Sequence, residues 1–348
     1  MNNFNRQLQQ MIDKEARKAN THAVLLGVQS GDGRVDFCGA AGDAAPEQPF
    51  FVASITKMFT AAVIMQLVDE GRLDLNAPVP AMLPQLNLAR IHVHKGTDYS
   101  PQLKVHQLVQ QTSGLADYYE DGLVDDLKQN KDFAYTVEDV LTMVRGMAAT
   151  AVPDSGKAHY SDTNYQLLGA IIEAVTGQPL AQVFQMRIFG PLGLENTAVY
   201  DPTAWQNGRQ PLPLYHEAQR LDVPLALSSM APDGGIVSTL ADGQRFLRAF
   251  FGGELFTAAH LPRMMQWHDL FFPLQYGYGL MRFKLPRWMN LFRETPELIG
   301  HSGSSGSFAF YVPQRDLTLV GTFNQIDKPQ RPFNFMLKVI NTIDKAAR

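Results

Sequence analysis

The chain has 348 residues, 45% of them hydrophobic and 18% charged, which predicts a globular protein with one large domain or two closely packed ones and excludes disordered and fibrous classes. It carries 34 Asp and Glu residues and 30 scattered Lys and Arg residues, a net charge of −4, so we expect no nucleic-acid partner. The single cysteine excludes an intrachain disulfide and cannot by itself form a metal site. We expect no metal and no cofactor.

The N-terminus lacks the basic-then-apolar pattern of a signal peptide. No apolar run reaches the roughly 18 residues that span a bilayer, so we expect no membrane span. On the chain as given the expected location is the cytoplasm. A signal peptide removed before residue 1 would make the protein periplasmic or secreted instead.

Hydrophobic periodicity and turn residues predict the order of helices and strands. Helices are expected at residues 4–19, 54–70, 103–111, 137–147, 163–176, 180–189, 240–251 and 332–346. Strands are expected at residues 22–29, 34–38, 234–238, 276–283, 298–301, 307–312 and 317–324. The first two strands form a hairpin, because Asp32 and Gly33 between them supply the positive φ of a tight turn. The helix at 54–70 is apolar almost all round, which is typical of a buried central helix.

Strands and helices near both ends, with helices between them, predict an α/β fold of the α+β type. We expect one antiparallel sheet built from both chain ends and flanked by helices, together with an all-helical region. Residues 1–75 and 231–348 are predicted to form the sheet domain, and residues 76–230 a mainly helical domain.

The strongest local signal is the pattern S-x-x-K at Ser54 and Lys57. On a helix these positions share a face, and the helix N-terminus favours a developing negative charge on the serine oxygen. One interpretation is a nucleophile beside its base, and the other is a capping serine with a solvated lysine. Lys57 lies within one of the most apolar helices, where a charge is costly without a purpose or a partner.

A second signal precedes the predicted helix at 163–176. Tyr160 and Asp162 have side chains that can hydrogen-bond a lysine and exchange protons with a serine. The alternative is an ordinary helix start, in which Ser161 or Asp162 caps the helix and Tyr160 packs against it.

The third signal is the Gly- and Ser-rich segment 300–306 on a predicted strand. Small residues on an edge strand let a substrate backbone approach closely, whereas the alternative is a simple turn. The segment also nearly matches the G-x-S-x-G nucleophile elbow. That match fails because Ser304 occupies the place of the second glycine and no histidine follows His301.

In order and spacing, S-x-x-K, Y-S-x and H-S-G resemble the three active-site motifs of the serine β-lactamase and penicillin-binding-protein superfamily. The resemblance is closest to the class C branch, with the D-alanyl-D-alanine carboxypeptidases and lactamase-like esterases. It covers nearly the whole chain and includes five supporting segments, at residues 66–75, 111–115, 191–194, 234–239 and 276–279.

This resemblance implies a serine hydrolase whose site lies at the junction of the two domains. Ser54 would be the acylated nucleophile, Lys57 its partner, and Tyr160 the proton shuttle and the base for deacylation. The oxyanion hole would be the backbone amides of Ser54 and Ser304. The implied substrate-binding and oxyanion residues are Tyr118, Asp162, His301, Ser302, Gly303 and Ser304. The expected partner is a small ester, peptide or β-lactam substrate.

Two residues depart from the family pattern. Where the family usually has asparagine, this chain has Asp162, which when ionised lacks an amide donor and favours a protonated Lys57. Where lactamases have lysine, this chain has His301, about a quarter protonated at pH 7 if its pKa is near 6.5. Both differences favour esters or small amides over penicillins.

Several alternatives stay open at this stage. His92 and His94 have a spacing found in metal sites, but surface histidines are the simpler interpretation. The aromatic pairs at 118–119 and 271–272 fit either a core or a cleft. A catalytically silent penicillin-recognising fold and a true β-lactamase remain alternative functions, and the oligomeric state is not predicted.

Overall fold

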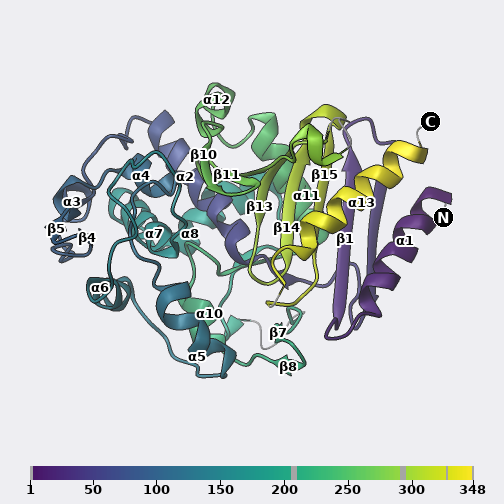
Figure 1. The fold of residues 1–348 in the computed structure, drawn as a ribbon, viewed down its shortest axis with the longest axis horizontal. Helices are drawn as coiled ribbons and strands as arrows, with labels where there is room; N and C mark the ends of the chain where they lie inside the picture. The colour runs from purple at the N-terminus through teal and green to yellow at the C-terminus, as the bar shows by residue number, and fades with distance from the viewer. Residues whose placement is uncertain (1–2, 205–209, 291–294, 327, 347–348) are drawn as a thin grey trace.

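The computed structural model describes residues 3–204, 210–290, 295–326 and 328–346. An eight-stranded antiparallel sheet lies at its centre, in the order β10-β11-β12-β13-β14-β15-β1-β2 (Figure 1). Its strands are β1 (Ala23–Ser30), β2 (Asp36–Gly42), β10 (His268–Phe271), β11 (Leu274–Tyr276), β12 (Met281–Phe283), β13 (Leu298–Ser302), β14 (Ser307–Val312) and β15 (Leu317–Thr322). The two ends of the chain meet where β1 pairs with β15, as the sequence predicts.

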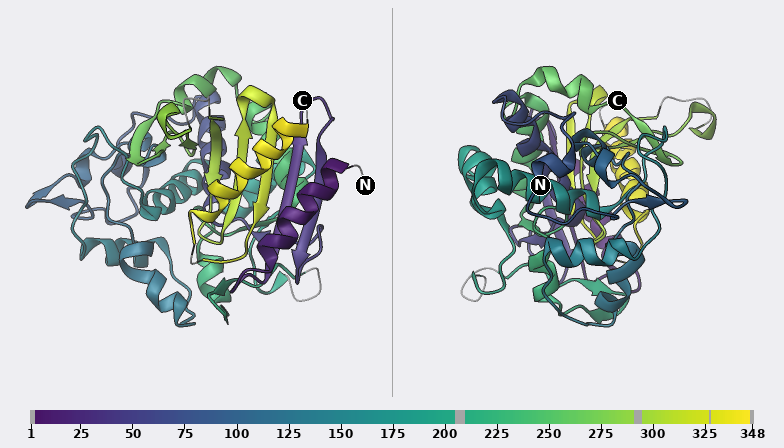
Figure 2. Two further views of the ribbon diagram at one scale, coloured as in Figure 1. Left: turned by 45° about the vertical axis from the view of Figure 1, so that its right-hand side comes forward. Right: turned by 90° about the vertical axis from the view of Figure 1, so that its left-hand side faces the viewer.

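Helices cover both faces of this sheet. The terminal helices α1 (Asn3–Ala16) and α13 (Arg331–Ala346) lie on one face, side by side with the strands (Figures 1 and 2). Their apolar stripes pack with the strands into one hydrophobic cluster, which contains Leu8 and Ile340. The helices α2 (Thr56–Asp69) and α11 (Leu240–Gly252) belong to a second cluster with the helical region.

Most of the remaining helices lie beside the sheet at the left of Figure 1, whereas α12 lies at the top, close to β10. The remaining helices are α3 (Val79–Met82), α4 (Val105–Val109), α5 (Val124–Lys128), α6 (Val137–Arg145), α7 (Asp162–Thr176), α8 (Leu180–Phe184), α9 (Gly190–Leu192), α10 (Pro224–Ser229) and α12 (Leu261–Met264). Among the described residues, no single helix has the length and apolar character to cross a membrane. Only the sharply bent pair formed by α7 with α8 and α9 passes that test, by length and composition.

The α+β fold class is confirmed, but residues 76–230 are not all helical. In the described part of the chain, seven further short strands are present: β3 (Phe50–Phe51), β4 (Val93–His94), β5 (Thr97–Asp98), β6 (Ala198–Val199), β7 (Tyr215–His216), β8 (Gln219–Arg220) and β9 (Ile236–Ser238). Most of them lie in the region predicted to be helical, and β6 pairs with β9 and so ties that region to the chain that follows it. Strands this short carry too little alternation to be recognised in a sequence.

The strand predicted at 276–283 is wrong, because the structure has a hairpin there. Residue 276 ends β11, and β12 begins at 281. Gly279 between them has φ +68°, and a Cβ at this position would lie 2.4 Å from the Cβ of Ala61 on α2. The glycine therefore permits both the turn and its close packing against the central helix.

Candidate active site

Ser54 lies in a short 3₁₀ turn, Ala53–Ile55, that leads directly into α2. Ala53 has φ +48°, a left-handed conformation that costs energy for a residue with a side chain. Strand β14 of the sheet holds this segment in place, because Ser307 Oγ donates a hydrogen bond to the Val52 carbonyl at 2.7 Å. The β14 strand and the start of α2 therefore fix the position of the serine together.

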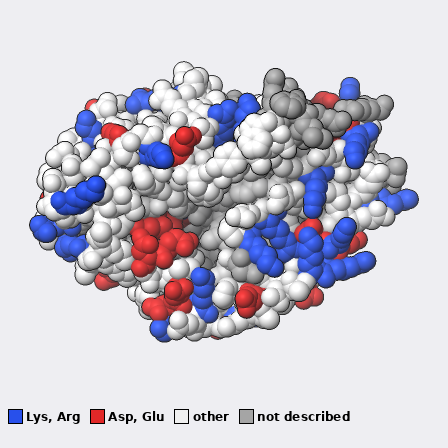
Figure 3. All heavy atoms as spheres, in the orientation of Figure 1, with Lys and Arg blue, Asp and Glu red and all other residues white. Residues whose placement is uncertain are grey.

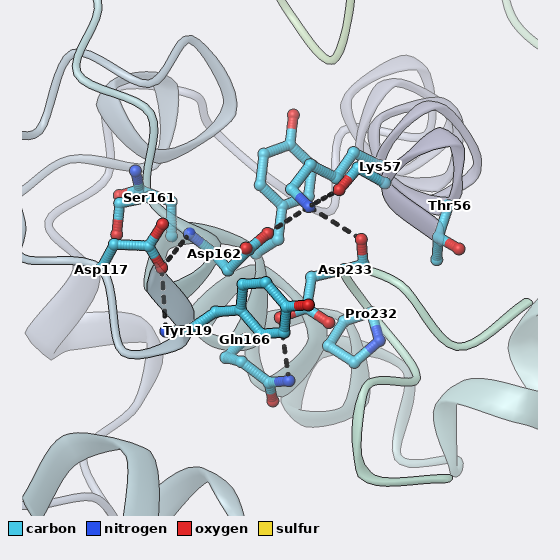
Figure 4. A network of polar contacts seen from close by, with 12 residues as sticks. Thr56, Lys57, Asp117, Tyr119, Ser161, Asp162, Gln166, Pro232 and Asp233 are labelled. Atoms are coloured by element: carbon cyan, nitrogen blue, oxygen red, sulfur yellow. Dashed lines mark hydrogen bonds and ion pairs between the residues drawn. The ribbon is translucent and has the colours of Figure 1, made fainter. Parts of the chain in front are cut away.

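Lys57 is completely buried and is the second residue of α2. Its Nζ donates hydrogen bonds to Ser54 Oγ at 3.2 Å and to the Asp233 carbonyl at 2.8 Å, and it forms an ion pair with Asp162 (Figure 4). Burial works to lower the pKa of Lys57, but the negative charge of Asp162 outweighs it and raises this pKa. Lys57 is therefore an ammonium that donates to the serine.

Tyr160 completes this group from the segment before α7. Its hydroxyl is hydrogen-bonded to Ser54 and to Lys57, and the Lys57 Nζ lies 5.1 Å from the centre of its ring. Burial raises the pKa of Tyr160, while the charge of Lys57 acts in the opposite direction. The resting hydroxyl is protonated, and the ammonium next to it is the charge that stabilises an oxyanion on either oxygen.

Two further buried carboxyl groups surround Lys57, and sequence reasoning did not single them out. Asp117 Oδ1 accepts hydrogen bonds from the backbone N–H of Asp162 and of Tyr119, both at 3.1 Å (Figure 4). Burial, and then the charge of Asp162, raise the pKa of Asp117 well above its ordinary value. Nothing in the spacing of the three motifs points to this residue.

Asp233 is the second of these carboxyl groups. Its Oδ2 accepts hydrogen bonds from Tyr118 Oη at 2.8 Å and from Gln166 Nε2 at 3.1 Å, whereas its buried Oδ1 has no partner among the described residues. Burial, and then the charge of Asp162, raise the pKa of Asp233 to about 7. The sequence offered one signal for Asp233: it is an acidic residue placed between apolar neighbours and Gly234.

His301 is placed differently from the expectation. Its side chain is completely buried and does not line the cavity beside Ser54. Nδ1 donates to the Ser302 carbonyl at 2.7 Å, and Nε2 lies 3.2 Å from Tyr276 Oη. Burial and the charge of Lys57 lower the pKa of His301 to about 3, so the partly protonated, carboxylate-binding histidine expected from the sequence is wrong.

The Gly- and Ser-rich turn after β13 contacts the segment just before Ser54 directly. A Cβ on Gly303 would lie 2.6 Å from the Val52 carbonyl and 2.3 Å from Ser307 Oγ. The strand is also not an edge strand as predicted, because β13 pairs with both β12 and β14. Pairing with β12 ends at Gly300, however, which leaves the residues after it open on that side.

A cavity of about 840 Å³ opens beside Ser54, between the sheet and the helical region. Figure 3 shows the hollow on this face, with acidic side chains gathered next to it. It is lined by most of the predicted site residues, namely Ser54, Tyr118, Tyr160, Asp162, Ser302, Gly303 and Ser304. Tyr118 is nevertheless completely buried, and its hydroxyl donates a hydrogen bond to Asp233. The exposed pair Phe271 and Phe272 lines the cavity and so belongs to a cleft.

The two histidines with metal-like spacing have structural partners. His92 is buried, not at the surface, and its Nε2 lies 2.8 Å from the Ser113 carbonyl. His94 Nδ1 lies 3.0 Å from the Ala149 carbonyl. Within the described residues, no group of three His, Cys, Asp or Glu side chains could hold a metal ion.

A family model described as Beta-lactamase matches residues 8–338. The chain belongs to the beta-lactamase family. Its curated relatives include penicillin-binding protein 4 of Amycolatopsis lactamdurans, which is 28% identical over 57% of this chain and 50% of that protein. Esterase EstB of Burkholderia gladioli is 30% identical over 42% of this chain and 37% of that protein. The chain thus matches half or less of the length of these relatives.

Solved structures of the beta-lactamase fold match nearly the whole chain. A D-stereospecific amidohydrolase from Streptomyces has a TM-score of 0.73 and 28% identity, over 91% of this chain and 93% of that one. The D-amino acid amidase from Ochrobactrum anthropi SV3 has a TM-score of 0.82 and covers 99% of both chains. At 23% identity, this second likeness shows the fold alone. The family resemblance predicted from the three motifs is confirmed.

Proposed function

We propose that this beta-lactamase family member is a serine hydrolase that acts through an acyl-enzyme on small esters or amides. The observation that carries the proposal is the contact of Ser54 Oγ with Lys57 Nζ at 3.2 Å and with the Tyr160 hydroxyl, at the wall of an 840 Å³ cavity. The names of its relatives, which include an esterase and an amidohydrolase, support this class of reaction.

In the proposed reaction, Ser54 Oγ attacks the carbonyl carbon of the substrate. Its proton passes through the pair formed by Lys57 and Tyr160 to the leaving oxygen or nitrogen, whose bond to the carbonyl carbon breaks. Water then attacks the acyl-serine ester with Tyr160 as the proposed base: as the Tyr160 oxygen takes a proton from the water, its own hydroxyl proton moves to Ser54 Oγ, and the bond between Ser54 Oγ and the acyl carbon breaks. The backbone amides of Ser54 and Ser304 are the proposed donors to the carbonyl oxygen as it becomes negative.

The charges of the site support esters and amides over β-lactams. No described residue that lines the cavity is a lysine, arginine or histidine, and His301 is neutral and buried. The site therefore offers no cation to the carboxylate of a penicillin. Asp162, whose carboxyl group pairs with Lys57, has no amide N–H to donate to a substrate carbonyl.

The test is the intact mass of the protein after treatment with a fluorophosphonate, and separately with a penicillin. We expect one fluorophosphonate adduct on the wild-type chain and none on Ser54→Ala. A control is Ser155→Ala, which alters an exposed serine that does not line the cavity and should still be labelled. Labelling that persists in Ser54→Ala contradicts the proposal. A stable penicillin adduct without ester hydrolysis would favour a penicillin-recognising binding protein.

A further inference from the structure

The charged and the apolar residues that line the cavity beside Ser54 lie on different parts of the chain. All the acidic residues that line it come from the segment between residues 117 and 233. The described lining residues from 270 to 334 include no acidic or basic side chain. They belong to strands β10 to β13, to the start of α13 and to the segments next to these elements. A substrate that reaches Ser54 therefore meets one wall without charge.

A row of apolar side chains on this wall follows strand β12. Met281, Phe283 and Leu285 all line the cavity, whereas Arg282 and Lys284 between them do not. Successive side chains of an extended chain point to opposite faces, so one whole face of this segment is turned to the cavity. From Met281 to Phe283 alone, the row is about 7 Å long.

The near end of the row lies beside the nucleophile. Ser302 Oγ donates a hydrogen bond to Met281 Sδ at 3.5 Å, so the row begins at the H-S-G motif. The next residue of that motif is Gly303, where a Cβ would lie 2.8 Å from the Cβ of Ala53. Ala53 directly precedes Ser54. A group attached to the reacting carbonyl can therefore extend from the serine along the row.

The row continues into exposed apolar residues across the sheet. Phe283 pairs with Leu274 of β11, and Leu274 pairs with Phe271 of β10. Phe271 and its neighbour Phe272 also line the cavity, although 60% and 66% of these residues are exposed. Met289 does the same and is 46% exposed. Single exposed apolar residues are common in proteins, but a group of them at one cavity is typical of a ligand-binding groove.

We propose that the row formed by Met281, Phe283 and Leu285 binds a linear alkyl chain of the substrate, on the acyl or on the alcohol side of the bond that is cleaved. The methylenes of such a chain leave water as they contact the row, which favours binding. A charged group placed there would lose its water and find no partner on this wall. This inference rests on the proposed hydrolase function and names the substrate class of the same site.

The test measures kcat/KM along two series of esters in which only the alkyl chain grows. One series is p-nitrophenyl butyrate, hexanoate and octanoate, and the other is butyl, hexyl and octyl acetate, each below the concentration at which it aggregates. Complete burial of one methylene corresponds to about a fourfold gain in kcat/KM. We therefore expect a gain of about tenfold or more from the shortest to the longest ester in one series, and that series identifies the side that carries the chain.

Variants assign the gain to the row. In the double variant Met281→Gln with Leu285→Gln, the gain from the shortest to the longest ester should fall several-fold, mainly through KM for the longest, and urea unfolding checks that the variant is folded. The matched control is Lys284→Gln, which alters the exposed residue next to Leu285 that does not line the cavity. Its gain should equal that of the wild type.

Binding without turnover gives a second measurement that does not depend on the double variant. Calorimetry with Ser54→Ala compares butyramide and octanamide, which are neutral and differ only in chain length. We expect octanamide to bind at least tenfold more tightly, with a more negative heat-capacity change, as burial of apolar surface requires.

The results distinguish a wrong substrate class from a wrong reaction. A kcat/KM that stays constant along both series, or equal binding of the two amides, overturns the inference and leaves the hydrolase intact. A gain that appears only above the aggregation concentration also overturns it and indicates docking on a lipid surface instead. A folded double variant that keeps the full gain overturns the assignment to this row. Absence of Ser54 labelling together with absence of ester hydrolysis overturns the proposed function itself.

Discussion

Replacing Asp233 with asparagine removes one buried acid from the group around Lys57 and leaves the size of the side chain nearly unchanged. Folding raises the pKa of Asp233 from 3.8 to about 7, chiefly through burial and then through the charge of Asp162. In this pH range the folded protein holds a proton that the unfolded chain has lost. The free energy of unfolding therefore falls as pH rises from the unfolded pKa through the folded one. Asparagine does not titrate, so the free energy of unfolding of the variant does not fall with pH for this reason.

The size of the effect follows from the shift. A change from 3.8 to about 7 corresponds to about 4 kcal/mol at pH 9, since one pKa unit is about 1.36 kcal/mol. About 1.5 kcal/mol of this is already lost at pH 5, because the unfolded carboxyl is mostly ionised there. The stability of Asp233→Asn relative to the wild type should therefore increase by about 2.5 kcal/mol between pH 5 and pH 9.

The measurement is urea unfolding of the wild type and the variant at pH 5, 7 and 9. Any constant effect of the new amide on Tyr118 and Gln166 cancels, because only the change with pH is compared. Asp139→Asn is a suitable control. Hydrogen bonds from Thr136 lower the pKa of this exposed acid, so its contribution to the free energy of unfolding is lost only as pH falls and does not change between pH 5 and pH 9. A difference between wild type and Asp233→Asn that does not grow with pH would refute the reasoning.

Two further predictions concern the motif residues. Lys57→Ala, Tyr160→Phe and the double variant should lose kcat/KM for p-nitrophenyl butyrate to similar extents, because the two side chains act on one proton; strictly multiplicative losses would show independent action. His301→Lys places a second ammonium in a buried site close to Lys57, so urea unfolding should show a loss of roughly 3 kcal/mol. Faster hydrolysis of a chromogenic cephalosporin by a stable His301→Lys protein would contradict the buried placement.

The local sequence was sufficient to predict a structural feature wherever the physical cause of that feature lies within one short segment. The all-apolar run after Ser54 predicts α2, because a helix without a polar face must be buried. Asp32 and Gly33 predict the β1–β2 turn, and Gly33 has the positive φ that this turn requires. The spacing of Ser54 and Lys57 brings their side chains together through helix geometry alone.

Tertiary structure decided the charges of the site. His301 is neutral because Tyr276 and Lys57, from distant segments, surround it with protein in place of water. Asp117 and Asp233 are far apart in the chain, yet both respond to the charge of Asp162. Burial and Coulomb interactions depend on neighbours in space, and neighbours in space depend on the whole fold. The sequence by itself therefore pointed to Ser54, Lys57 and Tyr160, which the fold brings together, whereas the acidic lining of the cavity beside Ser54 emerged only when the chain was folded.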